Sequence, residues 1–405
     1  MLNSRLLYLA LLLIFISCEE QAHTLDDTDL SLSVDTISFD VVRGITYKVP
    51  PLMGGSKFLY LGHNNGYSFD YNFIRASKFS NNQYYISSGN IISQFHDYID
   101  STITIDSVKL TLNFVEDSIS TNALFALRYF PNVSDSVFSR NNTNYLNFNS
   151  NFSDIISYGT IIQDTSSSML VFNIDTVHFK HFTDTTISSF NNTFAISVEN
   201  NDSNFFKFYS ANNGQSTVSN LSVYFKHFAS DTLTIDTLNT HNIIDDLTIL
   251  TPPDLNGIDT AGLSISLAKG LKSLITVDTK SWNIPAGSVF RKAELIFNSV
   301  NQDSNESSII NSYLLTGLDF PNSFFSFTEE TFAYDLTNGS SATIKDNALK
   351  FNHRSALKKS LLEKNSFHTF NIQPNVDVDP FKTIRFYGLE NPLFHPKLRI
   401  TYVLP

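Results

Sequence analysis

Residues 108–114 read Val108-Lys109-Leu110-Thr111-Leu112-Asn113-Phe114, with an apolar side chain at every second position. Successive side chains of a β-strand point to opposite faces, so the four apolar residues share one face and the polar residues share the other. The same alternation occurs at 221–225 and at 398–402. Strands with one apolar face are typical of antiparallel sheets that bury one side and expose the other to water.

Short patterns from the first half of the chain return in the same order in the second half. The spacing between partners drifts by a few residues, as loop insertions and deletions would cause, and this order predicts a tandem duplication. The matched segments are Asp35–Asp40 with Asp231–Asp236, Val108–Leu112 with Ala293–Phe297, Tyr129–Asn132 with Asp319–Asn322, Phe172-Asn173 with Phe351-Asn352, Thr193–Ile196 with Thr369–Ile372, Phe208-Tyr209 with Phe386-Tyr387, and Leu221–Tyr224 with Leu398–Thr401.

The composition also favours strands. The chain has 15 Gly and 12 Pro, whereas Asn, Ser, Thr and Asp are abundant, which suits short strands joined by Asx and Ser/Thr turns. We therefore predict an all-β protein with two tandem antiparallel β-sandwich domains of jelly-roll-like arrangement, at 31–229 and 231–405. One helix is predicted at Ser355–Lys364, where three leucines share a face, on the edge of a sandwich.

The first 18 residues carry the pattern of an export signal. Arg5 precedes an apolar run that is too short to span a bilayer, and the small Ser17 stands directly before Cys18. The segment resembles the bacterial lipoprotein signal, in which a peptidase cuts before a cysteine that then carries acyl chains, although Phe15 replaces the usual Leu. The resemblance implies a signal peptide at 1–17 and lipidation of Cys18. The alternative is an ordinary secretory signal with an incidental cysteine.

Glu19 and Glu20 follow Cys18 directly, within a polar tether at 18–30. This acidic pair resembles the export tag of Bacteroidetes-type surface lipoproteins. The resemblance implies a protein that is lipid-anchored in the outer membrane and exposed at the cell surface, with a periplasm-facing protein as the alternative. Two or more acyl chains make an anchor that persists on cellular timescales.

The second half of the chain carries structural motifs in a recognisable order. A basic residue precedes Ser at Lys272-Ser273, an Ile-Pro turn follows at Asn283–Gly287, a strand begins at Lys292-Ala293, and a closing strand spans Pro396–Tyr402. This order resembles the DNRLRE, or disaggregatase-related, family of secreted β-sandwich modules, which look like jelly-roll carbohydrate-binding modules. The match is thinner in the first half. It implies the fold and a surface location, and it carries no site residue.

The charge argues against nucleic-acid binding, and the cysteine content excludes an intramolecular disulfide. The net charge is −12 without a long block of like charge, so no basic patch is available for nucleic acid. Cys18 is the only cysteine, so no intramolecular disulfide can form. The fold must depend on its core, for which 36 Phe and 17 Tyr are available.

The sequence contains no motif of a metallohydrolase, a serine hydrolase, a nucleotide-binding loop or a dinucleotide-binding fold. We therefore predict that the protein is not an enzyme and needs no cofactor. The alternative is a surface hydrolase or lyase that degrades polysaccharide, because a catalytic carboxylate pair can be drawn from 39 acidic residues. Asp377 and Asp379 are candidate ligands of a structural calcium ion, against the simpler reading of solvated carboxylates beside Pro380.

Sugar binding would need exposed aromatic rings. The candidates are Trp282, Tyr67, Tyr84 and Tyr85, and for Trp282 the alternative is a half-buried packing role. Taken together, the sequence predicts a non-enzymatic surface lipoprotein that presents tandem modules for adhesion, glycan binding or surface assembly. Its expected partners are the membrane, through the anchor, and a polysaccharide or surface protein. A structural subunit of an outer-membrane complex, joined by strand addition, is a further alternative.

Overall fold

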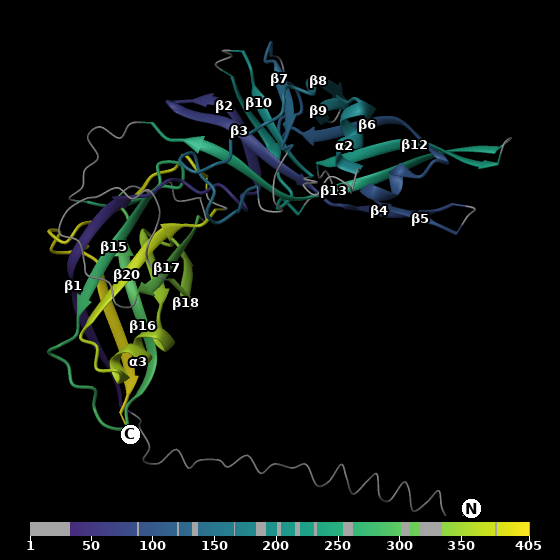
Figure 1. Ribbon diagram of the computed structural model, residues 1–405. Helices are drawn as coiled ribbons and strands as arrows, with labels where there is room; N and C mark the ends of the chain where they lie inside the picture. Colours follow the sequence, from purple (N-terminus) through teal and green to yellow (C-terminus); the bar gives the residue numbers. More distant parts are fainter. Residues whose placement is uncertain are drawn as a thin grey trace, which may run out of the picture.

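The computed structural model of the 405-residue chain describes residues 33–86, 89–119, 121–131, 137–165, 167–183, 192–200, 204–214, 219–230, 233–253, 262–300, 308–315, 334–376 and 379–404 (Figure 1). The predicted signal peptide at 1–17, the predicted lipidation site Cys18 and the tether at 18–30 lie outside these ranges. Within them, no helix is long and apolar enough to cross a membrane.

Two large antiparallel sheets, one of ten strands and one of eight, hold most of the described residues, and this confirms the predicted all-β class. Each sheet is barrel-like, and we call the ten-stranded one the first barrel and the eight-stranded one the second barrel. The first barrel consists of β2 (Phe58–Asn64), β3 (Tyr67–Ala76), β6 (Ile103–Asn113), β7 (Phe125–Tyr129), β8 (Ser157–Asp164), β9 (Ser167–Ile174), β10 (Thr193–Val198), β11 (Phe205–Tyr209), β12 (Asn220–Ser230) and β13 (Leu233–Thr251). The second barrel consists of β1 (Val34–Lys48), β15 (Leu271–Asp278), β16 (Val289–Asn298), β17 (Ile309–Leu315), β18 (Tyr334–Thr343), β19 (Ala348–Asn352), β20 (Phe367–Pro374) and β22 (Lys397–Val403).

Both sheets follow the same order around a ring. In the first barrel the order is β10-β7-β8-β9-β6-β12-β13-β3, and pairing of β10 with β3 closes the ring, while β2 and β11 extend it. In the second barrel the order is β18-β17-β20-β15-β1-β22-β16-β19, and a bridge between Lys345 and Ala348 joins its two ends. A ring of about eight strands is just wide enough for side chains to fill its interior.

β1 and β13 each pair with two different neighbours along their length. β1 pairs first with β22 and then with β15, and β13 pairs first with β12 and then with β3. β1 therefore belongs to the second barrel and β13 to the first. The predicted boundaries, 31–229 and 231–405, do not follow the sheets at these two strands. The reason is that only two residues separate β12 from β13, so the start of the second repeat continues the first barrel.

The strand pairings of the two barrels match at the positions that the sequence repeat aligns. Leu110 of β6 pairs with Leu221 of β12, and the matching residues Leu295 of β16 and Leu398 of β22 also pair. The pairing of β9 with β6 likewise corresponds to that of β19 with β16. The two barrels therefore share strand order and register.

Helices lie at matching places in the two barrels, with α2 (Thr176–Thr183) between β9 and β10 and α3 (Arg354–Leu362) between β19 and β20. The helix predicted at 355–364 is thus confirmed as α3. Leu357 is buried as the predicted apolar face requires, but Leu362 is 68% exposed. The helix therefore presents an apolar residue to solvent as well as to the core.

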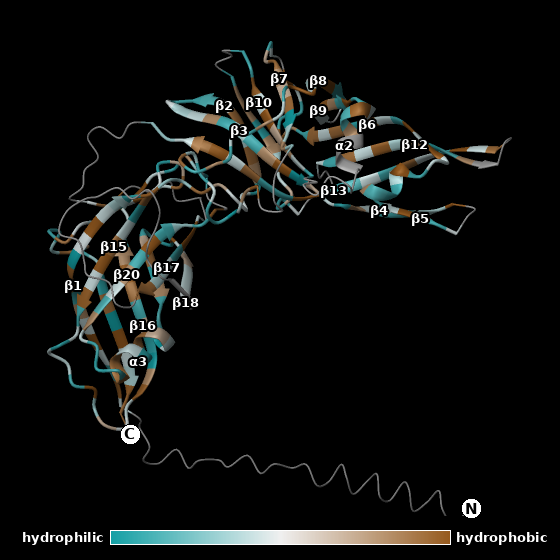
Figure 2. Ribbon diagram, viewed as in Figure 1, coloured by the Kyte–Doolittle hydropathy of each residue, from teal (hydrophilic) through white to brown (hydrophobic). Residues whose placement is uncertain are grey.

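Each barrel has its own core, built from residues that alternate along the strands (Figure 2). Leu110 and Phe172 are fully buried in the first barrel, as are Leu295 and Phe351 in the second. Burial of one such side chain contributes roughly 1.5–3 kcal/mol, so the many buried Phe and Leu residues account for a fold without disulfides.

A third apolar cluster joins the barrels. Phe381, in the segment between β20 and β21 (Ile384–Phe386), packs edge-on against rings of the first barrel. Its ring centroid lies 5.4 Å from that of Tyr67, 5.7 Å from that of Phe69 and 5.5 Å from that of Phe205. We call this contact the joint, and it fixes the second barrel to one face of the first (Figure 1).

The chain also crosses between the barrels close to the joint. Val49, directly after β1, donates its backbone N–H to the carbonyl of Gly270 at 2.9 Å. Gly270 has a φ of +64°, and a Cβ at this position would lie 1.8 Å from the Val49 oxygen. Only glycine allows this approach, so the sequence requires Gly270 where the strand β1 leaves the second barrel.

Candidate interaction surface

Two of the four predicted sugar-binding rings are packed inside the protein. Trp282 is half-buried, with ring centroids 5.6 Å from Phe39 and 5.7 Å from Tyr402. Tyr67 is 5% exposed and belongs to the joint with Phe381. Tyr67 is therefore not a free platform as predicted, and Trp282 has the packing role that was its alternative.

The other two predicted rings lie on a two-stranded hairpin formed by β4 (Phe79–Tyr85) and β5 (Ile91–Gln94). Tyr84 points inward, with its ring 5.9 Å from that of Phe225 and its hydroxyl 3.4 Å from Nδ1 of His227. Tyr85 points outward and is 64% exposed. Adjacent strand residues face opposite ways, so only one of the pair remains on the surface.

The β4–β5 hairpin lies over the second half of β12 and the first half of β13. Besides the Tyr84 contacts, Asn81 donates from Nδ2 to Oδ1 of Asn242 at 2.7 Å, and Ser77 N–H donates to the carbonyl of Asn242 at 2.7 Å. We call this two-layered feature the tongue, residues 79–86, 89–94, 224–230 and 233–238. Figure 1 shows it at the end of the first barrel that is farther from the second barrel.

The tongue exposes apolar residues on both of its outer faces. Tyr85 and Ile91 are cross-strand partners on the β4–β5 side, and Tyr224 and Leu238 are partners on the β12–β13 side. Contiguous apolar residues exposed on one surface mark interaction sites in many proteins. The apolar residues of the tongue that are between 37% and 64% exposed are Phe79, Tyr85, Ile91, Tyr224, Phe228, Leu233 and Leu238.

Charged groups beside the tongue are held by neighbouring side chains. Lys226 Nζ lies 3.3 Å from Asp106 Oδ2, and Lys109 Nζ lies 5.3 Å from the ring centroid of Tyr224. Hydrogen bonds from the side chain and backbone of Thr102 lower the pKa of Asp100.

Asp379, one of the two candidate calcium ligands, lies next to the joint. Its Oδ1 accepts a hydrogen bond from the backbone N–H of Phe381 at 3.1 Å, so it orders the turn that presents that ring. Asp377, the other candidate, lies outside the described residues. Across the ranges that the structure describes, no group of three or more His, Cys, Asp and Glu side chains could hold a metal ion.

Several titratable side chains are buried in hydrogen-bonded positions. Burial lowers the pKa of His241 to about 4, and its Nε2 lies 3.0 Å from the hydroxyl of Tyr98. Burial raises the pKa of Asp246 to about 7, and its Oδ2 accepts the backbone N–H of Ala211 at 2.6 Å. Because these groups are enclosed by the fold, they affect its stability and do not face a substrate.

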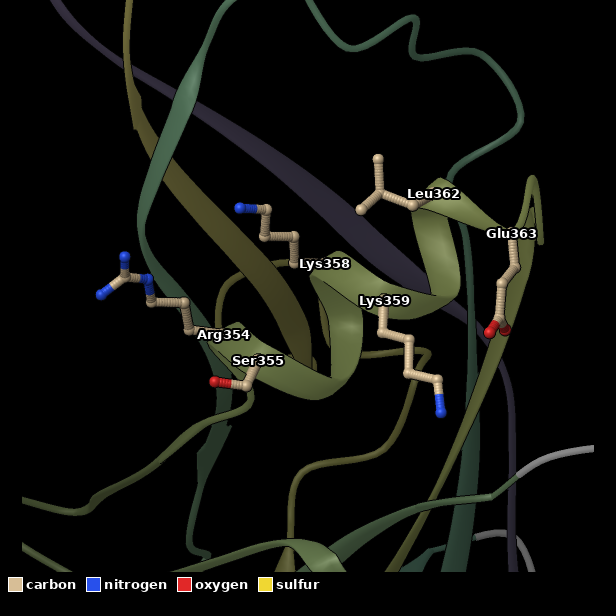
Figure 3. Close-up of a pocket in the computed structure, with 6 residues that line it drawn as sticks. All are labelled: Arg354, Ser355, Lys358, Lys359, Leu362 and Glu363. Atoms are coloured by element: carbon tan, nitrogen blue, oxygen red, sulfur yellow. The ribbon is translucent and has the colours of Figure 1, made fainter.

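A shallow hollow lies over the outer side of α3 (Figure 3). It contains one carboxylate, Glu363, whereas glycoside hydrolysis by the usual mechanism needs two carboxylates across a cleft. This hollow therefore does not supply the paired acids of the predicted alternative hydrolase. Its lining residues are Arg354, Ser355, Lys358, Lys359, Leu362 and Glu363.

A comparison of the chain with protein-family models finds no match, and a comparison with curated proteins finds none. The resemblances to lipoprotein signals and to the DNRLRE family therefore stay predictions.

The sequence reasoning missed the apolar side of the tongue. Phe228 and Leu233 flank the two residues between β12 and β13, across the predicted domain boundary, and Leu238 is the cross-strand partner of Tyr224. That spacing is the signal of a hairpin and could have placed both strands in one sheet. The exposure of their outer faces has no such signal, because alternation does not say which face is covered.

Proposed function

We propose that this protein is a lipid-anchored surface protein that binds a protein partner through the tongue of its first barrel. The observation that carries the proposal is the set of exposed apolar residues on both outer faces of the tongue. The pattern around Cys18 supports the anchor. The proposed location is the outer face of the outer membrane, and the proposed role is adhesion or surface assembly without catalysis.

The shared register of the two barrels supports an origin by duplication of one β-sandwich-like module. We infer that both copies keep the ring and that the first copy gained the binding surface. In this proposal the second barrel serves as the support that joins the first barrel to the anchor.

The chemistry of the tongue favours a protein over a glycan. Ile91, Phe228 and Leu233 offer apolar area and no hydrogen-bonding side chain, whereas protein interfaces have such apolar centres with polar rims. Sugar recognition needs polar groups beside an aromatic face, and Tyr85 is the ring that best meets this need. Glycan binding at Tyr85 is the second candidate.

Photocrosslinking on intact cells tests the proposal. A photoreactive phenylalanine analogue at Leu233 should give a discrete crosslinked product, whereas the same analogue at Leu393, a 75% exposed residue of the second barrel, should give none. A product that is a polysaccharide conjugate instead would favour the glycan candidate. Equal labelling from both positions, or from neither, would contradict a binding role for the tongue.

A Cys18→Ser variant that still fractionates with the outer membrane would contradict the anchor.

A further inference from the structure

One end of the second barrel collects the start of β1, the end of β22, the start of β16 and the turn after α3. Val403 pairs with both Val34 and Val289, and Phe367 pairs with Asp278 at the end of β15. The described part of the chain therefore begins at this end, and Figure 1 shows α3 and the C-terminus there. Any tether that leads back to Cys18 must leave from this side of the barrel.

This end is basic although the protein is acidic. Arg354, Lys358, Lys359 and Lys364 lie exposed on or directly after α3, with Glu363 as the acidic residue among them. Exposed Lys280 follows β15, where the Thr279 N–H donates to the carbonyl of Ser366 at 2.8 Å. Half-buried Asp278 on that strand and exposed Asp35 at the start of β1 are further carboxylates at this end, so the basic residues named here remain in excess. The whole chain carries −12, so this end differs in sign from the molecule as a whole.

Apolar side chains are exposed among these basic ones. Leu362 is 68% exposed and Phe367 is 61% exposed, and Val34 and Val289 are each more than half exposed. Figure 3 shows Arg354, Lys358 and Leu362 following one another along one side of α3. Basic residues interleaved with exposed apolar residues are the composition of a surface that lies on a bilayer. We call these basic and apolar residues together the basic pole. Its members are Val34, Lys280, Val289, Arg354, Lys358, Lys359, Leu362, Lys364 and Phe367.

The basic pole is rigid where it faces the barrel. Ala356 and Leu357 are buried in the core, and Ser360 Oγ lies 3.2 Å from Nδ1 of His368, whose Nε2 lies 3.0 Å from Thr279 Oγ1. The backbone of α3 is thus held against the barrel. Docking would order its exposed side chains but would not have to order the helix itself.

We propose that the basic pole seats on anionic lipid headgroups of the membrane that holds the anchor. The inference rests on the proposed lipid anchor, and it adds an orientation to it. Anionic headgroups attract the basic pole and repel the acidic remainder, while Leu362 and Phe367 enter the interface between headgroups and acyl chains. The seated protein directs its tongue away from the bilayer, where a partner can reach it.

A site-specific probe in vesicles tests the seating. Full-length lipidated protein with Leu362→Cys carries one free thiol, because Cys18 is blocked by acylation, and this thiol takes an environment-sensitive fluorophore. The matched control is Leu393→Cys, which is exposed and lies before β22, at the opposite end of that strand from Val403. Vesicles are made of phosphatidylcholine with or without phosphatidylglycerol.

In anionic vesicles the probe at 362 should shift to the blue and lose several-fold in quenching by aqueous iodide, while the probe at 393 should not change. Molar salt should reverse the effect, because it shortens the screening length from about 8 Å to about 3 Å. The triple variant Arg354→Glu, Lys358→Glu, Lys359→Glu should behave like the protein in neutral vesicles, with circular dichroism confirming its fold. Equal quenching at 362 and 393 in floated anionic vesicles would overturn the seating alone. Failure of the protein to float with any vesicle would overturn the anchor and the seating with it.

Discussion

The two barrels differ most in one segment of matching position. The first barrel has residues 77–102 between β3 and β6, whereas the second barrel has residues 279–288 between β15 and β16. Both segments close one end of a ring. In the second barrel Trp282 and Ile284 pack against the core, and the ring of Trp282 lies against Phe39 and Tyr402.

The longer segment closes its ring with four buried apolar side chains, Ile86, Ile92, Phe95 and Tyr98. Phe95 lies in the short 3-10 helix η1 (Phe95–Ile99), and its ring centroid is 4.2 Å from that of His241. The ring centroid of Tyr98 is 5.5 Å from that of Phe225. These contacts correspond to those of Trp282 in the second barrel. His241 pairs with Leu221, Phe39 pairs with Leu398, and the repeat aligns Leu221 with Leu398, so His241 and Phe39 occupy matching positions.

In both barrels this segment therefore covers one end of the ring, and in the first barrel it also forms the β4–β5 hairpin, whose Ile86 and Ile92 are buried in the core. A short loop with Trp282 suffices to close the second barrel. The extra residues of the first barrel build the tongue and expose Tyr85 and Ile91.

Phe95→Ala should have the largest effect on stability. Phe95 is 3% exposed, and truncation of a buried Phe costs about 3–5 kcal/mol. Urea unfolding followed by far-UV circular dichroism should show an earlier transition of the first barrel. Fluorescence of Trp282, the only tryptophan, reports the second barrel and should keep its midpoint. If the fluorescence midpoint falls by the same amount, the barrels unfold as one unit and the comparison of separate rings is broken.

The alternation around Leu110 and Leu295 was enough to predict strands, their buried faces and the repeat, because a period of two fixes which side of a strand is apolar. It could not predict that β1 joins the second barrel and β13 the first. Strand partners depend on which edges meet in three dimensions, and the alternation of β13 suits either sheet. A repeat in sequence is therefore a poor guide to sheet membership at its ends.

The candidate surface was less predictable than the fold. Tyr67, Tyr84 and Tyr85 occur in similar polar surroundings, yet they become a joint residue, an inner residue and an exposed residue. Tyr67 is covered by Phe381, which lies more than 300 residues later in the chain. Local sequence contains no information about such a cover.

Asp246→Asn should have the next largest effect, and it depends on pH. In the second barrel the position that matches Asp246 holds Gly44. Asp246 of β13 pairs with Ile74 of β3, and Gly44 of β1 pairs with Ile275 of β15, the corresponding strand. The pKa of Asp246 is raised from 3.8 to about 7, chiefly by burial. The folded state binds this proton more tightly than the unfolded state, so the stability it contributes is present below pH 4 and is lost as the pH rises to about 7.

The Asn variant keeps an acceptor for Ala211 and has no charge to bury. It should raise the melting temperature by up to roughly 8–16 °C at pH 8, from a gain of up to about 4 kcal/mol, and by little at pH 4. Calorimetry at both pH values measures this difference. A Gly44→Ala control in the second barrel should show no such pH dependence. A variant that is no more stable than the wild type at pH 8 would show that the coulombic attraction of Arg140 for the Asp246 carboxylate outweighs the cost of its burial.

Phe381→Ala should have a smaller effect on stability and a clear one on shape. The ring is partly buried, so its loss should cost about 1–2 kcal/mol, but it removes the edge-on contacts with Tyr67, Phe69 and Phe205 that fix the barrels to each other. Small-angle X-ray scattering should show a broader distribution of interatomic distances. Phe367→Ala, at an exposed ring of the same barrel, is the matched control and should leave the scattering curve unchanged. An unchanged curve for Phe381→Ala would mean that the crossing chains alone hold the angle.

The smallest predicted effect concerns the loop before β22, which the second barrel ties to β1 through one histidine. His395 Nε2 lies 2.8 Å from Oδ1 of Asp40, and its Nδ1 lies 2.9 Å from the carbonyl of Asn391. Both neighbours are acceptors, so both ring nitrogens must donate, and this favours the imidazolium and raises the pKa of His395, with the Asp40 hydrogen bond as the main cause. The stabilisation is therefore complete below the ordinary pKa of 6.5 and is lost as the pH rises through the higher folded value. Because the pair is exposed to solvent, Asp40→Asn should cost less than about 1 kcal/mol at pH 6 and nothing at pH 9. NMR titration should show the pKa of His395 falling toward 6.5 in that variant, while an unchanged value would show that the Asn391 carbonyl alone sets it.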